Sequence, residues 1–182
     1  MTTENQQLKA DATAYIALGS NLGDREETLL SSIAALRQLG SVDAISSFYE
    51  TEPVGMVEQP DFLNAVVALQ TALPPRELMA ALLRIEQQHG RDRSVSVPKG
   101  PRTLDLDLLS YGDVVTETPA LTLPHPSVAE RRFVLAPLKE IAPQWRHPIN
   151  GKTAAILLSE LLQREGDFSQ PIRKAQSSTP SA

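Results

Sequence analysis

The sequence predicts an α/β protein of the α+β sandwich type, with the element order β-α-β-β-α-β followed by a further strand and helices. Three observations lead to this prediction. Short apolar runs bounded by glycine, proline or polar residues have the length of strands. Two longer segments, near 25–39 and 75–90, repeat leucine and isoleucine at helical spacing. The run at 103–111 alternates leucine with aspartate, which is typical of a strand with one buried face.

The first half of the chain is interpreted from apolar spacing and from residues that start or stop helices. Asp24, followed three residues later by Glu27, resembles a capping box and predicts the start of a helix over 25–39. Gly40 then predicts its end. The other elements expected in this half are strands at 14–18, 42–49 and 62–71, with a turn-rich loop at 50–60.

The second half completes the predicted core. Pro74 and Pro75 predict the start of a helix that ends at Gly90. A polar loop at 91–101 leads into the leucine–aspartate strand, and the resulting order is the ferredoxin-like split arrangement. The elements expected beyond it are a strand at 120–123 and helices at 128–140 and 153–163. We therefore expect one domain over 13–166, with polar, disordered tails at 1–12 and 167–182.

Composition excludes several classes of protein. The 182 residues carry a formal net charge of −5, which gives no basic footprint for nucleic acid. There is no cysteine for a disulfide or a zinc-thiolate site. No apolar run approaches the length of a membrane span, so we expect a cytoplasmic protein with no membrane partner. Residues 84–102 nevertheless hold five basic side chains against two acidic ones, as an anionic small substrate requires.

Asp105 and Asp107 are the first candidate site residues. On one strand face their side chains lie roughly 6.5–7 Å apart, twice the rise per residue. Unpaired carboxylates do not pack into an apolar core, so this face meets water, a cation or a basic partner. Mg²⁺ typically takes one or two carboxylates together with substrate phosphates, and Arg102 lies close enough in sequence to reach the same phosphates. A solvated strand face and a metal site explain the pair about equally well.

An aromatic side chain and an amide form a second candidate site. Phe62 and Asn64 share one strand face, and together they suit a flat heteroaromatic ligand. Phe133, beside Arg131, is the natural second wall. The alternative interpretation makes both phenylalanines core residues and Asn64 an edge residue. His125, between two prolines, is a catalytic candidate or an ordinary surface histidine, and Glu86 could be a boundary carboxylate.

Taken together, these residues resemble the 6-hydroxymethyl-7,8-dihydropterin pyrophosphokinase family of folate biosynthesis. The resemblance covers about residues 14–145. It rests on the segments 15–23, 47–51, 59–65, 84–86, 124–126 and 131–133, and above all on Gly-Pro-Arg-Thr-Leu-Asp-Leu-Asp at 100–107. This sequence departs from the family pattern at Leu83, Ala120 and Pro126 and in the loop 94–99, which bears on ATP contacts.

The resemblance implies transfer of pyrophosphate from ATP to the hydroxymethyl group of 6-hydroxymethyl-7,8-dihydropterin, leaving AMP. It implies these residues for catalysis: Arg91, Arg102, Asp105 and Asp107, with the two aspartates binding two Mg²⁺ ions. For the pterin it implies Thr51, Val54, Phe62, Asn64 and Phe133. For ATP it implies Glu86, Arg93, Arg102, Leu108, Leu121, Thr122, His125 and Arg131.

Two other functions fit parts of the pattern. A non-catalytic ferredoxin-like module that binds a small ligand explains the topology but leaves the aspartates, the basic loop and the aromatic face unrelated. A metal-dependent phosphatase would release phosphate where the pyrophosphokinase releases AMP. We expect a monomer acting on small molecules.

Overall fold

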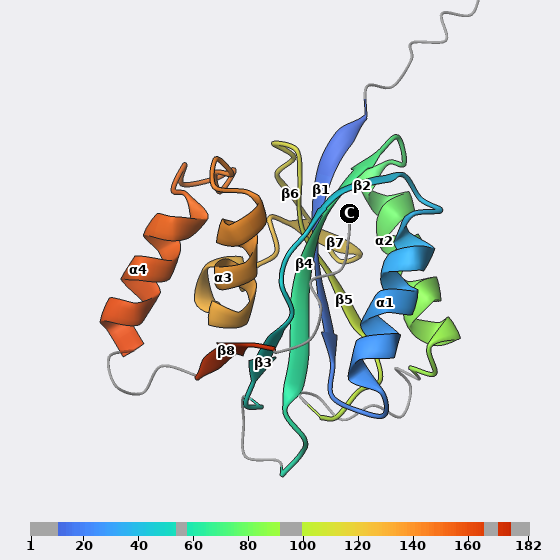
Figure 1. Ribbon diagram of the computed structural model, residues 1–182. Helices are drawn as coiled ribbons and strands as arrows, with labels where there is room; N and C mark the ends of the chain where they lie inside the picture. The colour runs from blue at the N-terminus through green and yellow to red at the C-terminus, as the bar shows by residue number, and fades with distance from the viewer. Residues whose placement is uncertain (1–10, 54–57, 92–99, 166–170, 176–182) are drawn as a thin grey trace, which may run out of the picture.

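Figure 1 shows the computed structural model, in which residues 11–53, 58–91, 100–165 and 171–175 are described. A twisted β-sheet forms the middle layer. Helices α1 (Arg25–Leu36) and α2 (Pro75–Gln88) cover one face, and α3 (Arg132–Ile141) and α4 (Ala154–Glu165) lie on the other (Figure 1). The predicted α/β class is confirmed, and the C-terminal helices make the arrangement three layers deep.

The sheet is antiparallel, and its order is β5-β1-β4-β3-β8, with β2 also paired to β4. Its long central strands are β1 (Ala12–Ser20) and β4 (Phe62–Thr71), and β5 (Asp105–Tyr111) lies beside β1. The shorter strands are β2 (Ser41–Ile45), β3 (Tyr49–Thr51) and β8 (Ile172–Lys174). Because β2 and β3 together take the place of one strand, the predicted ferredoxin-like order is confirmed.

Local sequence accounts for the helix starts. The Asp24 side chain accepts a hydrogen bond from the Glu27 backbone N–H at 3.0 Å, as the capping prediction requires. Pro75 occupies the first turn of α2, where its missing N–H costs nothing. Helix α3 follows a short 3₁₀ turn, η1 (Val128–Glu130), so the single helix predicted at 128–140 is interrupted. A small hairpin of β6 (Thr116–Thr118) and β7 (Leu121–Leu123) precedes this turn.

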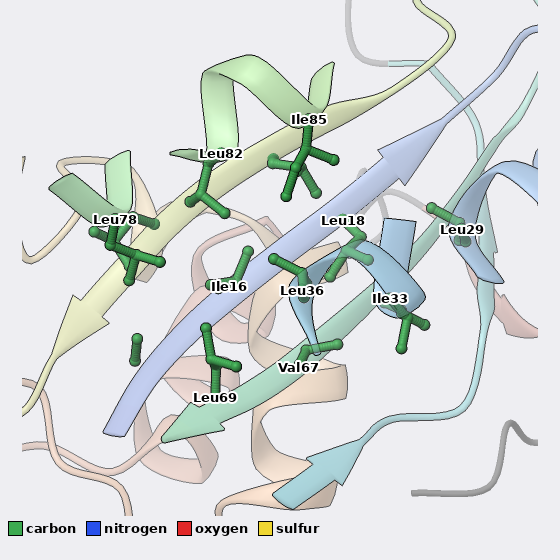
Figure 2. Packing of buried hydrophobic residues seen from close by; sticks show 14 of the residues in the cluster. Ile16, Leu18, Leu29, Ile33, Leu36, Val67, Leu69, Leu78, Leu82 and Ile85 are labelled. Carbon is green, nitrogen blue, oxygen red and sulfur yellow. The ribbon is translucent and has the colours of Figure 1, made fainter. Parts of the chain in front are cut away.

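The main core lies between the sheet and the pair α1 and α2. Figure 2 shows leucine and isoleucine side chains of the two helices packed against those of β1 and β4. Leu104, Leu106 and Leu108 enter the same cluster and are at most 3% exposed. The predicted alternation is therefore confirmed, because three leucines of this run take the buried face and leave the aspartates on the other.

The opposite sheet face changes from apolar to polar along β1. Ala17 lies opposite Val66 and Asp107, and it packs against the cluster formed by α3 and α4. Two residues further on, Gly19 lies opposite Asn64 and Asp105. Helix α3 thus covers the apolar half of this face, and polar residues occupy the half towards the end of β1.

Two local predictions were wrong for reasons that the structure makes clear. The strand predicted at 42–49 breaks at Ser46, whose hydroxyl accepts the Val66 N–H at 2.9 Å in place of a backbone partner. Helix α1 ends at Leu36, before Gly40. Gly40 is instead required by close approach, since a Cβ there would lie 2.0 Å from the Gln70 carbonyl oxygen.

The predicted tails also need correction. Strand β8 lies inside the predicted tail 167–182. Strand β1 begins at Ala12, the last residue of the predicted tail 1–12, so both predicted tails contain residues of the sheet. Backbone pairing with β3 outweighs the polar composition at β8. Among the described segments, none of the helices has the length and apolar character that crossing a membrane requires.

Candidate active site

Asp105 and Asp107 project from β5 on the sheet face that also carries Gly19 and Asn64. They are half-buried, with 21% and 26% of their side chains exposed. Neither packs into the apolar core, and the two do not point to opposite sides of the sheet. This geometry is the one that a metal or phosphate site on the strand requires.

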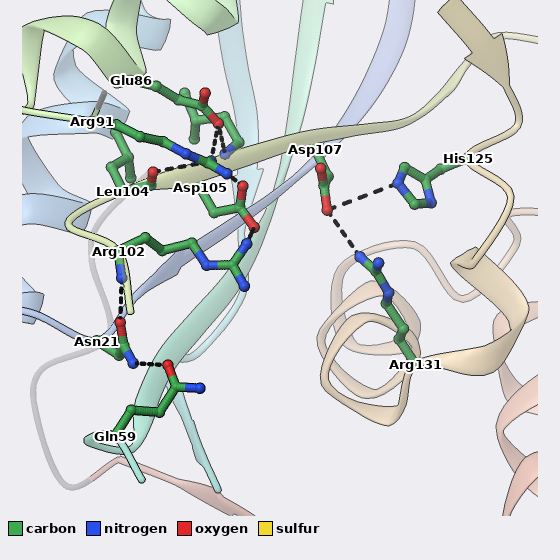
Figure 3. Close-up of polar contacts among 11 residues, drawn as sticks. Asn21, Gln59, Glu86, Arg91, Arg102, Leu104, Asp105, Asp107, His125 and Arg131 are labelled. Carbon is green, nitrogen blue, oxygen red and sulfur yellow. Dashed lines mark hydrogen bonds and ion pairs between the residues drawn. The ribbon is translucent and has the colours of Figure 1, made fainter. Parts of the chain in front are cut away.

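Asp105 is bound by two arginines (Figure 3). Its Oδ1 accepts a short hydrogen bond from Arg91, and its Oδ2 accepts one from Arg102 Nη1 at 2.8 Å. Arg91 also donates to Glu86 Oε1 at 2.6 Å. Burial alone would lower the pKa of Arg91, but the neighbouring carboxylates, Asp105 first among them, raise it, so this guanidinium stays charged.

Glu86 acts from behind Arg91. Its side chain is 1% exposed, and besides Arg91 it accepts the Leu106 backbone N–H at 2.8 Å. The carboxylate thus joins α2 to β5 and orients Arg91, which in turn meets Asp105. The contact of Glu86 with ATP stays a prediction, and the burial of its side chain behind Arg91 favours a role in orienting that arginine.

Asp107 has a different set of partners. Its Oδ2 lies 3.0 Å from Arg131 Nη1 and 3.9 Å from His125 Nε2 (Figure 3). The Ser127 N–H donates to His125 Nδ1 at 3.1 Å, so the neutral ring carries its proton on Nε2, facing Asp107. Burial, reinforced by Arg131, lowers the pKa of His125 despite the opposing effect of Asp107, which favours the neutral ring.

Each candidate phenylalanine carries one of these arginines on its ring. The guanidinium carbon of Arg102 lies 5.3 Å from the ring centre of Phe62, and that of Arg131 lies 5.8 Å from Phe133. Both distances suit a cation–π contact. Since Arg102 binds Asp105 and Arg131 binds Asp107, each aspartate is connected to one aromatic ring through an arginine.

Asn64 and Thr51 form a buried polar pair next to Phe62. The Asn64 amide donates to Thr51 Oγ1 at 2.8 Å, and the two residues are 4% and 3% exposed. Gly19 lies beside them, where a Cβ would come within 3.1 Å of Asn64 Oδ1 and 4.0 Å of the Asp105 Cβ. A side chain at position 19 would therefore occupy the space between the amide and the aspartate.

Asn21 is a site residue that the sequence argument did not single out. It is 1% exposed, and its Oδ1 accepts the Arg102 backbone N–H at 2.7 Å. Its Nδ2 donates to Gln59 Oε1 at 2.9 Å and to the Pro60 carbonyl at 3.0 Å. Asn21 thus connects the segment that carries Arg102 to the one before Phe62 (Figure 3). The Gly-Ser-Asn-Leu-Gly run was a usable signal, but no local rule indicates these distant partners.

The remaining predicted residues lie around this centre or away from it. The Leu108 side chain is 3% exposed and belongs to the core on the opposite sheet face, so the predicted ATP contact cannot involve that side chain. Leu121 is buried and Thr122 half-buried in β7. Val54 and Arg93 lie outside the described residues.

The donor set fits Mg²⁺ better than a softer metal. Within the described residues, no group of three or more histidine, cysteine, aspartate and glutamate side chains could hold an ion by itself. Two carboxylates, by contrast, suit Mg²⁺ when phosphate oxygens complete its coordination. The Nε atoms of Arg91 and Arg102 are buried without an acceptor in the described part of the chain, which suits a bound anion.

A separate cavity of about 500 Å³ opens near the start of α1. It is lined by Gly23, Asp24, Arg25, Glu26, Glu50, Leu63 and Ala175. None of the predicted site residues is among them, so the aspartate centre, and not this cavity, is the candidate site.

Comparisons with known proteins show similarity in sequence and in fold. The family described as 7,8-dihydro-6-hydroxymethylpterin-pyrophosphokinase (HPPK) matches residues 15–143. The chain is 50% identical over 133 residues to a 2-amino-4-hydroxy-6-hydroxymethyldihydropteridine pyrophosphokinase of Bacillus subtilis, covering 72% of this chain and 78% of the relative. It is 46% identical over 132 residues to the Haemophilus influenzae protein of the same name, covering 71% and 81%.

Among solved structures, wild-type Plasmodium falciparum HPPK-DHPS with SDX-DHP shares the fold, with a TM-score of 0.67 at 15% identity. The match covers 89% of this chain but only 46% of that longer chain.

Proposed function

Because the chain belongs to the 7,8-dihydro-6-hydroxymethylpterin-pyrophosphokinase family, we propose that it transfers pyrophosphate from ATP to 6-hydroxymethyl-7,8-dihydropterin. The products are AMP and the pterin diphosphate, and the reaction is a step of folate biosynthesis. The observation that carries the proposal is the Asp105–Asp107 pair on one sheet face, surrounded by Arg91, Arg102 and Arg131.

The two aspartates are the proposed metal ligands. Asp105 and Asp107 would hold two Mg²⁺ ions, which would supply positive charge for the triphosphate and activation of the attacking hydroxyl, as two-metal sites do. In the absence of a ligand, the positive charges of the three arginines balance the negative charges of three carboxylates, Glu86, Asp105 and Asp107. A triphosphate adds negative charge, which a site with only acidic ligands would repel.

Arg91 and Arg102 are the proposed phosphate-binding residues. A guanidinium that binds a carboxylate can bind phosphate oxygens with the same fork of donors. Glu86 keeps Arg91 oriented while it does so, because the carboxylate is buried and joined to β5. Pyrophosphoryl transfer depends mainly on positioning and charge stabilisation, so no side-chain nucleophile is required.

His125 and Arg131 are proposed to bind ATP beside Asp107. The Nε2 proton of neutral His125 is a donor available to a phosphate oxygen, and Arg131 adds a charge. The family resemblance also implies Arg93 and Thr122 at the nucleotide. It implies Leu121 and Leu108 on the adenine side, where Leu108 would contribute backbone only.

The pterin is proposed to stack on Phe62 and Phe133. Both rings lie on the sheet face that carries the aspartates, and each is in contact with an arginine. Asn64, oriented by Thr51, would bind the pyrimidine edge through its remaining amide donor and its oxygen. Backbone groups near Thr51 and Val54 would complete that edge.

The test is incubation of the protein with ATP, Mg²⁺ and the hydroxymethyl pterin, followed by separation of the nucleotide products. We expect AMP and the pterin diphosphate in equal amounts, and no AMP without pterin or without Mg²⁺. Release of phosphate would favour the phosphatase, and binding without turnover would favour the non-catalytic module.

Asp107→Asn is the matching variant, and it should abolish AMP formation. Asp113→Asn is the control, since Asp113 is exposed in the turn after β5 and should keep full turnover. Equal activity of the two variants would refute the metal assignment. Monomeric state and cytoplasmic location stay predictions from the sequence, and sedimentation of the protein would test the first.

A further inference from the structure

Strand β8 lies beyond residues 15–143, the part of the chain that matches the family. It pairs antiparallel with β3, with Tyr49 opposite Lys174, Glu50 opposite Arg173, and Thr51 opposite Ile172. The pairing continues past the strand, because the Ala175 N–H donates to the Phe48 carbonyl at 2.8 Å. Every residue of β3 therefore has a partner in β8.

Strand β3 needs this partner. It has only three residues, and β4 is its neighbour on the inner side. Without β8 its outer edge would present unpaired backbone groups, and so short a strand is stable only when its neighbours fix it. Thr51 ends this strand, and its hydroxyl accepts the amide proton of Asn64. A shift of β3 would thus reach Asn64 directly.

Lys174 connects β8 to a second element of the site. Its Nζ lies 3.2 Å from Ser47 Oγ and 3.4 Å from Glu140 Oε1. Glu140, near the end of α3, also accepts the Tyr49 hydroxyl at 2.7 Å. Helix α3 carries Phe133 in its first turn, so the same contacts join the strand with Thr51 to the helix with the second aromatic ring. Lys174 is 60% exposed, however, and exposed ion pairs contribute little.

We propose that β8 is a positioning element for pterin recognition. Its backbone pairing fixes β3, and β3 presents Thr51 and through it Asn64 to the pterin. Loss of the pairing weakens pterin binding and leaves ATP binding unchanged, because the described ATP-side residues, such as His125 and Arg131, lie beside β5. The inference rests on the proposed function of the same site.

The test compares three variants at one exposed position. Arg173 is 71% exposed and makes an ion pair with Asp61 at 4.0 Å, which every variant removes. Arg173→Pro removes a backbone N–H from the centre of β8, Arg173→Gly keeps it but weakens the strand, and Arg173→Ala keeps the pairing. We expect the KM for pterin to rise up to about tenfold in Arg173→Pro, the effect of losing one hydrogen bond, and by less in Arg173→Gly.

Arg173→Ala should match wild type for both substrates, and the KM for ATP should stay within about twofold in all variants, since rim charges contribute little. Titration of the pterin and of an ATP analogue separately repeats the comparison without turnover. If Arg173→Pro does not fold, the comparison of glycine with alanine decides.

The positioning role would be overturned if the variants lost affinity equally for pterin and for ATP. It would also be overturned if pterin binding were unchanged in both the proline and the glycine variants. Failure of the proposed function is distinguishable, because wild type would then form no AMP with the pterin.

Discussion

Replacing Glu86 by alanine should lower the free energy of unfolding and also displace Arg91. The carboxylate is 1% exposed, and it accepts hydrogen bonds from the Leu106 backbone N–H and from Arg91. Alanine leaves that N–H buried without its acceptor, which costs about 1–3 kcal/mol. Arg91 keeps its ion pair with Asp105. Losing its pair with Glu86 therefore costs less than the about 3–5 kcal/mol typical of breaking a buried ion pair.

Together these losses amount to about 3 kcal/mol, a large part of the about 5–15 kcal/mol that stabilises a typical protein. For a chain of this length the midpoint of thermal unfolding should fall by about 6–12 °C. Glu86→Gln keeps an oxygen for the Leu106 N–H and loses only the charge, so it should cost about 1 kcal/mol. Turnover should fall in both variants, because Arg91 loses the group that orients it.

Urea unfolding followed by circular dichroism measures the stability, and AMP formation measures the turnover. Glu77→Ala is the control, since Glu77 is exposed on the first turn of the same helix and should cost at most about 1 kcal/mol. If Glu86→Ala costs no more than Glu77→Ala, the burial argument is wrong. If it is unstable but turns over normally, Glu86 does not position Arg91.

Two further predictions concern other buried polar groups. Asn21→Ala should cost about 2–4 kcal/mol in urea unfolding, because it leaves the Arg102 N–H and the Pro60 carbonyl without their side-chain partner; a loss below about 1 kcal/mol would contradict this. Burial lowers the pKa of His147 below 6.5, so its contribution to stability is complete above about pH 6.5 and is lost as pH falls through its native pKa. Fluorescence of Trp145, the one tryptophan in the sequence, reports unfolding beside His147. The free energy of unfolding of wild type should exceed that of His147→Gln, and this difference should shrink as the pH falls from about 7.5 to 5. A constant difference would refute this assignment.

Several elements could be predicted because their signals are local. The Asp24 cap, the proline start of α2 and the face alternation of β5 each depend on neighbours within a few residues. The split at Ser46 could not be predicted, since it depends on a hydroxyl meeting the Val66 N–H of another strand. Strand β8 escaped prediction for the same reason: its composition is polar, and only its pairing with β3 orders it.

The candidate site divides in the same way. The sequence indicated which residue types meet, including the aspartates, the basic loop and the aromatic–amide face. It did not indicate that Glu86 lies behind Arg91 or that Asn21 joins two distant segments. These contacts join residues far apart in the chain, so no spacing rule contains them.

By itself the sequence determined the family, the β-α-β-β-α-β order of the core and the shared face of Asp105 and Asp107. The shared face of the two aspartates follows because side-chain alternation along a strand is a property of the backbone alone. Only the tertiary structure decided which arginine binds which aspartate, and which strand supports Thr51. Those choices are made by packing, which brings together charges and backbone groups that the chain holds far apart.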